Sequence, residues 1–530
     1  MRTNRKLKAD FIVLGGGLGG CMAALAAAKS GLTVIMTEET DWIGGQLTAQ
    51  AVPPDEHRWI EQFGCTRSYA EFRRRVRGYY KSNYPLVDTA MNNEFLNPGN
   101  GWVSRLCHEP KVALQVLQDM LAAYTNSGRI QILYQHRIIE AVMEGDRCVC
   151  VKVINDDDDL VTLQGKYFAD ATECGDLLPL AGVEHVMGAE ARADTDEPHA
   201  ADNADPLDMQ SITHVFALDY EEGGDHTIDR PAQYDFWRQY VPQNYENLPL
   251  LGWLVPEISK NGTIKEYGLF RGKRGEWWES LFNYRRMIDK SLFNNELYKS
   301  DISLINWPQN DYHLGSIYGV SSHDRRKHLR GARQLSLCLL YWLQTEAPRL
   351  DGGKGYPGLR LRKDALGTDD GFAKAPYIRE SRRIESLYRI TEHDVSKEIR
   401  GDQGIRTYED SVGVGSYYLD LHMTTVSFRS LYVPTYPYEI PLGALLPVRV
   451  KNILPACKNI GTTQISNGCY RLHPTEWNIG ESVGYLVAYA LKNQLDPHDV
   501  REDSVHLQAY QDLLEQRGVQ LHWPEDIQLP

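Results

Sequence analysis

Apolar and polar residues near the start of the chain follow a strand–helix–strand pattern. Residues 11–14 form a short apolar run that fits a buried parallel strand. An Ala-rich segment that fits a helix follows, Gly31 ends it, and residues 33–36 are a candidate for a second strand. This order of elements predicts an α/β fold with a Rossmann-like parallel sheet.

Glycines mark the turn between the first strand and this helix. Gly15, Gly17 and Gly20 have the G-x-G-x-x-G spacing. Gly15 permits the tight turn, Gly17 lets the backbone approach a pyrophosphate, and Gly20 lets the helix lie close to the sheet. The helix amino terminus offers N–H groups to phosphates, and Glu38 would accept hydrogen bonds from ribose hydroxyls. The unit therefore predicts a dinucleotide site.

A second glycine pair indicates which dinucleotide binds. Gly44, Gly45 and Gln46 lie just beyond Glu38, where NAD dehydrogenases require no glycines. At this point the chain resembles the FAD proteins of the glutathione-reductase-like superfamily, in which a Gly-Gly pair lies close to the ribityl chain and the flavin. The resemblance implies FAD as the cofactor and argues against an NAD-linked Rossmann enzyme.

Length, charge and cysteine content narrow the class of protein. A chain of 530 residues is expected to hold two or more closely packed domains. The formal charge of −14 at pH 7 argues against nucleic acid or an anionic membrane as the main partner. The nine scattered cysteines lack zinc-like spacing, so we expect no metal and a cytoplasmic protein with reduced thiols. No apolar run is long enough to cross a bilayer, and no signal segment is expected.

The rest of the first half alternates loops with regular elements. Residues 51–110 are expected to form a loop-rich insertion, and Pro110 begins an amphipathic helix that ends near Gly128. A small β-meander is predicted for residues 130–133, 138–142, 148–154 and 161–168. The A-D-A-T segment after it resembles the second flavin-side motif of the superfamily, which implies that Ala171 and Thr172 lie at the cofactor.

Composition changes after residue 190. Five tryptophans, most of them expected in the core, and many Tyr, Asn and Pro residues are typical of a separate mixed α+β unit; the tryptophans are Trp237, Trp253, Trp277, Trp278 and Trp307. A helix is predicted near residues 328–346. We therefore expect a substrate or cap domain at residues 191–440, between the two parts of an FAD-binding domain at residues 1–190 and 441–530.

The carboxyl-terminal part carries the most specific resemblance. R-E-S-R-R-I at residues 379–384, Y-x-x-D-x-H at residues 417–422 and R-x-x-P-T at residues 471–475 occur in that order before an expected helix. Together with residues 10–46 and 168–183, they are similar to the family of FAD-dependent oxidoreductases that have a glutathione-reductase-type FAD domain.

This resemblance implies which end of the cofactor the last helix meets. The helix after Pro474 would point its amino end at the pyrimidine edge of the flavin, where its dipole stabilises negative charge. The residues expected to contact FAD are Gly15, Gly17, Leu18, Gly19, Gly20, Glu38, Glu39, Gly44, Gly45, Gln46, Ala171, Thr172, Pro474, Thr475, Asn478 and Ile479. One cofactor can contact all of them only if the two ends of the chain meet.

Candidate catalytic residues follow from the expected chemistry. Oxidation of a C–H bond by a flavin needs a base for the heteroatom proton, and His is suited to this because its pKa lies near working pH. His422 lies two residues from Asp420, which could orient the imidazole from the same strand face. His473, directly before the last helix, is the other candidate, and Tyr417 and Arg379 could bind substrate oxygens.

These observations lead to two hypotheses. The first is an FAD-dependent dehydrogenase or oxidase that moves a hydride from a small polar substrate, such as a sugar, polyol or amine, to flavin N5. The second is a flavin-binding protein without redox turnover, which serves as a binding or assembly component. A pocket lined by His422 and His473 would favour the first, and a flavin face blocked by protein would favour the second. The electron acceptor is open, and a homo-oligomer is possible.

Overall fold

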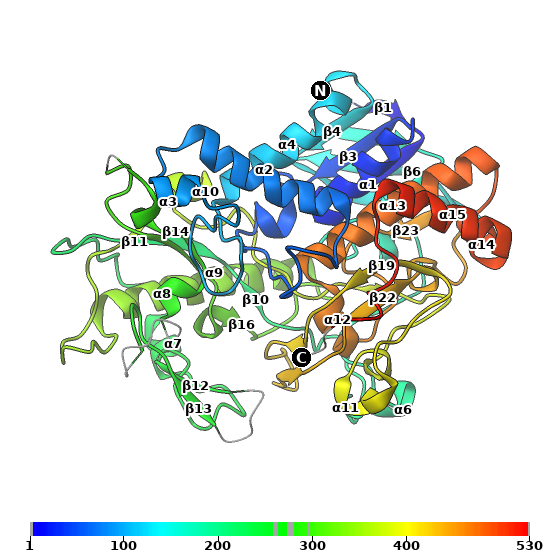
Figure 1. Ribbon diagram of the computed structural model, residues 1–530. Coiled ribbons are helices and arrows are strands. Elements are labelled where there is room, and N and C mark those ends of the chain that lie inside the picture. Colours follow the sequence, from blue (N-terminus) through cyan, green and yellow to red (C-terminus); the bar gives the residue numbers. More distant parts are fainter. Residues whose placement is uncertain (1–3, 258–262, 273–279, 295, 528–530) are drawn as a thin grey trace.

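A five-stranded parallel sheet carries the Rossmann-like part of the fold (Figure 1). The computed structural model describes residues 4–257, 263–272, 280–294 and 296–527. The strand order is β23–β8–β2–β3–β4, with β2 (Phe11–Leu14), β3 (Val34–Glu38), β4 (Ile130–Tyr134), β8 (Tyr167–Asp170) and β23 (Ile453–Pro455). All strands except the edge strand β4 are buried along their whole length, as in sheets covered on both faces. The α/β fold and its β–α–β start are confirmed.

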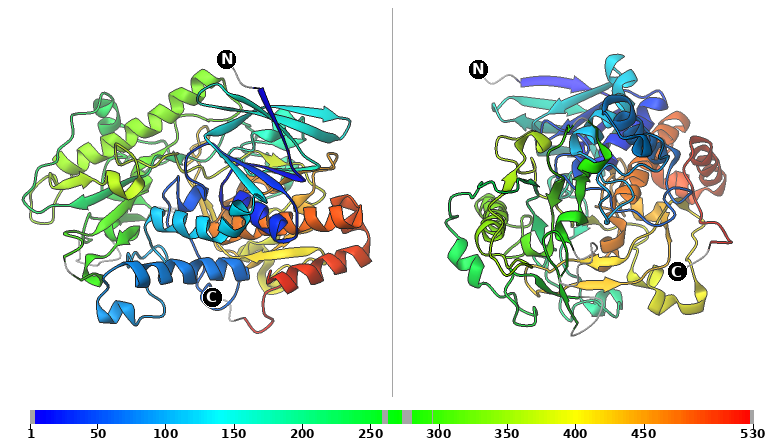
Figure 2. Two further views of the ribbon diagram at one scale, coloured as in Figure 1. Left: turned by 90° about the horizontal axis from the view of Figure 1, so that it is seen from above. Right: turned by 60° about the vertical axis from the view of Figure 1, so that its left-hand side comes forward.

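The two ends of the chain meet where α1 (Leu18–Lys29) packs on α13 (His473–Asn493). A Cβ at Gly480 would lie 2.0 Å from the Gly19 carbonyl oxygen, and one at Gly484 would lie 2.4 Å from the Ala23 carbonyl oxygen. Only glycine lets the two backbones approach this closely. Figure 2 shows α13 beside α2 (Arg67–Asn83), α4 (Pro110–Asn126) and α15 (Ser504–Arg517).

A second sheet has the strand order β1–β7–β6–β5. Three of its strands, β5, β6 and β7, come between β4 and β8 in the sequence. It consists of β1 (Asn4–Lys8), β5 (His136–Glu144), β6 (Arg147–Asn155) and β7 (Leu160–Gln164). The prediction placed residues 130–133 in this meander, but they form β4 and pair with β3 in the parallel sheet. Alternation of apolar residues predicts a strand but not the sheet that it joins. It does not predict β1, because N-R-K-L-K is largely charged.

The expected loop-rich insertion contains one long helix, α2. The Thr66 side chain accepts a hydrogen bond from the Tyr69 amide and caps the helix amino terminus. Tyr69, Phe72, Val76 and Tyr80 recur at helical spacing and are buried. The remaining parts of residues 51–110 are mostly irregular, with one further turn of helix at α3 (Asp88–Met91).

The middle of the chain forms a mixed α+β region around a four-stranded sheet and a long helix. The sheet order is β14–β15–β11–β17, with β11 (Phe216–Tyr220), β14 (Arg286–Ile288), β15 (Ile302–Ile305) and β17 (Leu359–Leu361). The predicted helix near residues 328–346 is α9 (Ser322–Thr345). Trp237 and Trp307 are buried in this region and Trp253 is half-buried, whereas Trp277 and Trp278 lie outside the described residues.

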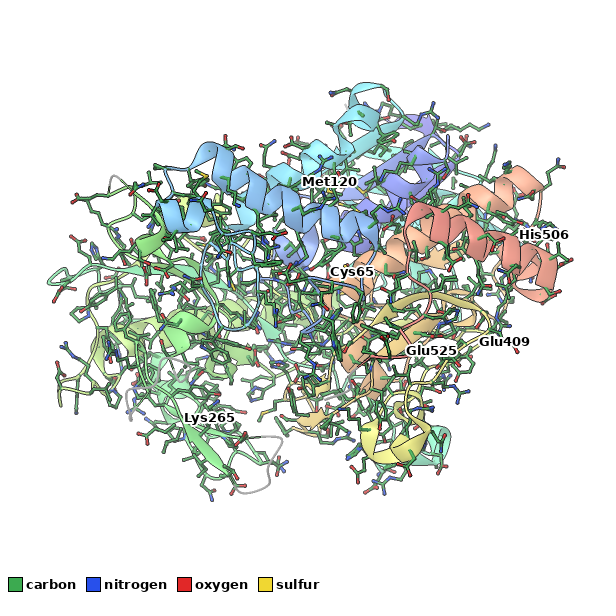
Figure 3. All side chains as sticks on the ribbon, in the orientation of Figure 1. Cys65, Met120, Lys265, Glu409, His506 and Glu525 are labelled. Atoms are coloured by element: carbon green, nitrogen blue, oxygen red, sulfur yellow. The ribbon has the colours of Figure 1, made fainter. Side chains whose placement is uncertain are left out.

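Short elements complete the fold. The short strands are β9 (His185–Val186), β10 (Ile212–Thr213), β12 (Leu254–Pro256), β13 (Ile264–Glu266), β16 (Asp311–Tyr312), β18 (Arg383–Ile384), β19 (Ser411–Gly415), β20 (Leu419–Leu421), β21 (Leu431–Val433) and β22 (Tyr438–Pro441). The short helices are α5 (Leu177–Leu180), α6 (Arg192–Thr195), α7 (Tyr234–Gln239), α8 (Leu281–Tyr284), α10 (Lys363–Leu366), α11 (Lys397–Arg400), α12 (Gln464–Tyr470) and α14 (Pro497–Glu502). Side chains fill the space between these elements, and Lys265 marks the projecting β12–β13 ribbon (Figure 3).

Two further predictions from the sequence concern membrane-spanning helices and domain boundaries. Within the described part of the chain, none of the helices combines the length and the apolar character needed to cross a bilayer. The domain boundaries at residues 190 and 440 stay a prediction, although β23, from the last segment, pairs with β8 of the first.

Gly480→Ala tests the helix contact. The added methyl group would meet the backbone of α1, and overpacking of this kind costs about 1–3 kcal/mol in the free energy of unfolding. The measurement is denaturant or thermal unfolding of the holoprotein. Gly78→Ala is the control, because Gly78 lies in α2 with no atom within 4 Å of an added Cβ, and alanine there is expected to be neutral or slightly stabilising. Equal stability of the two variants would contradict the close contact.

Candidate active site

A first cavity, here called the glycine cavity, lies at the carboxyl ends of β2, β3 and β8. Its empty volume, open mouth included, is about 860 Å³. The predicted cofactor residues that line it are Gly15, Gly17, Glu38, Glu39, Gly45, Ala171 and Thr172. In a parallel sheet this edge is where ligands bind, because the loops after the strands meet there.

The glycines of this cavity bring backbone to its wall. Gly15 has φ +98°, and a Cβ there would lie 2.2 Å from the Ala171 carbonyl oxygen. Gly20 lies against the turn, since its Cβ would come 2.0 Å from the Gly15 carbonyl oxygen. The Gly44 amide donates to the Gly16 carbonyl oxygen at 2.7 Å, which holds the second glycine pair beside the first.

Glu38 is a buried carboxylate held by backbone donors. Its Oε2 accepts from the Gly16 amide at 3.1 Å, and its Oε1 accepts from the Thr40 amide and hydroxyl, each at 2.8 Å. Burial raises the pKa of Glu38 to about 8, although the hydrogen bonds from Thr40 act in the opposite direction. Further O–H donors would stabilise its charged form. Glu39 is exposed at the mouth.

Buried polar side chains connect α13 to the glycine cavity. Glu476, in the first turn of α13, accepts from the Gly19 amide at 3.4 Å and from Gln46 Nε2 at 2.5 Å. Lys458, shortly after β23, is fully buried and forms an ion pair with Glu173. Gln46 Oε1 is buried with no partner among the described residues. The two ends of the chain thus contact each other beside the glycine cavity, whose lining includes no residue of α13, and their joint contact with one cofactor stays a prediction.

A second cavity, here called the arginine cavity, has a volume of about 620 Å³ including its opening. Aromatic and charged side chains form its wall: Asp55, Trp102, Tyr267, Leu281, Tyr284, Arg285, Asn306, Trp307, Pro308, Tyr377, Arg379, Tyr417, Asp420, His422 and Arg471. Four of the five predicted catalytic residues are in this set, namely Tyr417, Arg379, Asp420 and His422. They come from two stretches in the second half of the chain, one at Arg379 and one at residues 417–422, which includes β20.

One extended segment separates the two cavities. Pro376 and Ile378 line the glycine cavity, whereas Tyr377 and Arg379 line the arginine cavity. Tyr377 forms a bridge with Thr213, and alternate side chains of extended backbone point to opposite sides. The segment just before and into R-E-S-R-R-I is therefore a thin wall between the two sites.

His422 is held by a carboxylate that the sequence does not indicate. Asp311 Oδ2 lies 2.5 Å from His422 Nδ1, whereas the predicted partner Asp420 lies 3.5 Å from Nε2. Burial and the charge of Arg379 lower the pKa of His422, but the two carboxylates outweigh them and the pKa is raised. His422 also lines another hollow, which Phe428 lines too. Its side chain therefore lies between the arginine cavity and that hollow.

His473 occupies a different environment from His422. It is fully buried at the start of α13, and its Nδ1 accepts a hydrogen bond from the Asp55 amide at 3.1 Å. Its Nε2 has no partner among the described residues. Burial, with the nearby charge of Arg285, lowers the pKa of His473 well below its usual value, so the ring is neutral. It lies behind Asp55, which lines the arginine cavity.

The remaining predicted residues lie at the contact between the two helices. Leu18, Gly19, Pro474 and Ile479 are buried in α1 and α13. Thr475 Oγ1 lies 3.1 Å from the Tyr438 hydroxyl, and Asn478 donates to the Val412 carbonyl oxygen at 3.1 Å. None of these six residues lines the glycine cavity or the arginine cavity, and their contact with FAD stays a prediction.

Comparison with known proteins identifies the family. A model of the family described as FAD dependent oxidoreductase matches residues 10–514, which is nearly the whole chain. The chain belongs to this family. The resemblance noted in the sequence is thereby confirmed, and FAD is the cofactor that membership in this oxidoreductase family implies.

Solved structures show the breadth of the likeness. A quinol fumarate reductase FrdA variant from E. coli matches with TM-score 0.33 and 11% identity, over 97% of this oxidoreductase and 74% of that chain. OxyS anhydrotetracycline hydroxylase from Streptomyces rimosus matches with TM-score 0.31 and 9% identity, over 96% of this chain and 66% of that chain. L-proline dehydrogenase from P. horikoshii matches with TM-score 0.19 and 14% identity, over 36% of this chain and 25% of that chain. The match therefore spans a quarter of that protein's length. No curated protein sequence matches the chain.

The residues of the glycine cavity fit FAD. Gly17 is the N-cap residue of α1 and provides no side-chain cap. Apart from the Gly19 amide, which donates to Glu476, the amino terminus of this helix could face an anionic group such as a pyrophosphate. A Cβ at Gly17 or Gly45 would lie 3.1 or 2.8 Å from Glu173 Oε1, so glycine keeps the passage between them open. The unpartnered Gln46 Oε1 offers an acceptor further along. FAD supplies a two-electron acceptor when bound.

Sequence reasoning missed two groups at the arginine cavity, Asp311 and Arg285. Asp311 is 111 residues from His422, and Arg285 lies in the middle region where the chain resembles no named motif. Neither has a local signal, because Asp311 lies in W-P-Q-N-D-Y-H and Arg285 in N-Y-R-R-M-I-D, both among other polar residues.

Glu38→Ala tests the glycine cavity. Loss of a carboxylate that accepts hydrogen bonds costs about 1.5–3 kcal/mol, so FAD is expected to bind roughly 10- to 100-fold more weakly. The measurement is titration of the apoprotein with FAD by flavin fluorescence. Glu94→Ala, at an exposed position, is the control and is expected to bind FAD like the unmodified protein. Unchanged affinity in Glu38→Ala would rule out the ribose contact.

Proposed function

We propose that this FAD-dependent oxidoreductase oxidises a small polar substrate, such as a sugar, polyol or amine, in the arginine cavity, with the residues of the glycine cavity holding FAD. The observation that carries the proposal is the His422–Asp311 pair at a charged cavity that one extended segment separates from the glycine cavity. A protein that only bound flavin would not need a titratable pair in such a place. The proposal therefore favours turnover over a binding or assembly role.

His422 is the proposed base. Asp311 accepts the Nδ1 proton, which leaves Nε2 of the neutral ring to take a proton from the substrate hydroxyl or amine. The substrate carbon gives up a hydride, with both electrons of its C–H bond, and becomes a carbonyl or imine carbon. Asp311 and Asp420 stabilise the imidazolium that results. Tyr417 and Arg379 would hold substrate oxygens.

His473 as the base stays an untested prediction. Its neutral ring suits a base, but it lies behind Asp55 rather than on the cavity wall that contains His422. We propose instead that it fixes the Asp55 backbone, and thereby the position of the Asp55 carboxylate opposite Arg285.

Anaerobic reduction of the bound flavin is the test of the function. The purified holoprotein is mixed with sugars, polyols and amines without oxygen, and bleaching of the visible flavin absorbance is followed. At least one substrate class is expected to bleach the flavin completely. A protein that binds FAD, is reduced by dithionite and is bleached by no member of these classes would contradict the proposal.

Substitution of His422 tests the base. His422→Gln is expected to lower the rate of flavin reduction about 100- to 10,000-fold, the usual contribution of a general base. His473→Gln is the comparison, and a smaller loss is expected there. The flavin spectrum and unfolding temperature show whether each variant is folded and loaded. An equal loss in both variants would contradict the assignment of His422.

The pH dependence gives an independent test. The base must be neutral, so the rate is expected to fall as pH drops through the pKa of His422, which the carboxylates raise. Asp311→Asn removes one of these charges and lowers that pKa. The acidic limb of the kcat/KM profile is therefore expected to move to lower pH. A limb that stays in place would show that another group titrates.

A further inference from the structure

The polar atoms without partners around the arginine cavity have one property in common. Among its lining residues, all of which the structure describes, the buried side-chain nitrogen and oxygen atoms with no hydrogen-bond partner are all N–H donors. They are Nε and Nη1 of Arg285, Nδ2 of Asn306, Nε1 of Trp307, Nε of Arg379 and Nε of Arg471. Buried donors that lack an acceptor cost free energy, so a ligand that supplies acceptors would fit here.

Several acceptors of the same wall are already engaged. Tyr377 OH accepts from Arg471 Nη1 at 2.8 Å, and Asn306 Oδ1 accepts from Arg379 Nη2 at 3.2 Å. Asp420 accepts from Arg471 Nη2 at 3.3 Å. The Asp55 carboxylate lies 3.6 Å from Arg285, beyond hydrogen-bond distance, so the wall offers N–H donors to the acceptors of a ligand and one carboxylate to a ligand hydroxyl or amine.

Buried charges surround the cavity. Arg285, Arg379 and Arg471 are each at most 7% exposed. Three carboxylates face them, namely Asp55, Asp311 and Asp420. These charges balance while His422 is neutral, and the donors of Arg285 are still without an acceptor among the described residues.

Arg285 is the arginine with the fewest protein partners. Its Nη1 lies 3.6 Å from Asp55 Oδ1, which is too long for a hydrogen bond. Its guanidinium stacks on Tyr284, 4.9 Å from the ring centroid, so the plane is fixed and the N–H edges stay available. Arg379, by contrast, donates to four acceptors and serves mainly to hold Asp311 and the wall.

We propose that the substrate of the arginine cavity carries a carboxylate, and that Arg285 binds it together with the indole N–H of Trp307. The inference rests on the proposed function for the place of the reaction, and it narrows the small polar substrates to acids, such as sugar acids or amino acids. Arg285 and Trp307 then set specificity by orienting the carbon to be oxidised toward His422.

Matched pairs of probes test this inference without a known substrate. D-gluconate is compared with D-sorbitol, and L-proline with L-prolinol, because each pair differs in the carboxylate. Binding to the holoprotein is measured by the change in the flavin absorbance spectrum and by the shift in unfolding temperature. At least one carboxylate is expected to bind tenfold or more tightly than its neutral or cationic partner. A panel in which no carboxylate binds more tightly overturns the inference.

Substitutions assign the residues. Arg285→Gln is expected to weaken carboxylate binding at least tenfold and leave binding of the alcohols unchanged, while Arg285→Lys keeps part of the affinity. Trp307→Phe keeps the aromatic wall but removes the N–H, so a several-fold loss of carboxylate affinity is expected. This variant keeps the test decisive if Arg285→Gln does not fold. Arg230→Gln, an exposed arginine on the surface, is the control. Carboxylate affinity that is unchanged in both Arg285→Gln and Trp307→Phe refutes the assignment.

The two readouts separate this inference from the proposed function. Carboxylates that bind but never bleach the flavin would contradict the oxidation and leave the anion site in place. Alcohols or amines that bleach the flavin, with no preference for acids, would contradict the anion site and leave the oxidation in place.

Discussion

The fold depends on the contact of backbone with backbone between α1 and α13. Gly19 and Gly480 touch there, 461 residues apart, and a methyl group on either would enter the other helix or its neighbour. The closure places Glu476 within reach of the Gly19 amide and of Gln46. The glycine cavity lies beside this contact, and its wall comes from the first part of the chain and from residues of the middle region such as Ile317, Arg325 and Pro376.

The second constraint is the thin wall between the two cavities. Alternation along residues 376–379 sends one pair of side chains to each site, so a displacement of this segment would change both. Gln46 provides another link, because its Nε2 donates to the Arg471 carbonyl oxygen as well as to Glu476. These few residues connect the proposed FAD site to the wall of the arginine cavity.

The sequence was sufficient wherever the requirement was local. Gly15, Gly17 and Gly20 predicted a tight turn and close helix packing. The apolar runs predicted the strand–helix–strand pattern. The partner of His422 could not be predicted in this way. Spacing pointed to Asp420, two residues away, but the closest carboxylate is Asp311, brought in by a separate strand. Long-range contacts of this kind leave no periodic signal, and the same holds for Arg285 and for β1.

Buried charges distinguish the arginine cavity from an ordinary core. Replacing a buried ion pair with apolar residues of similar volume is often neutral or stabilising by about 1–4 kcal/mol, so stability alone does not explain this concentration of arginines and carboxylates. Arg379 and Arg471 each donate to the protein through both terminal nitrogens, whereas Nε and Nη1 of Arg285 have no partner among the described residues. Donors that the fold holds in place without an acceptor form a preorganised electrostatic site. The proposed carboxylate would complete the hydrogen bonding at Arg285.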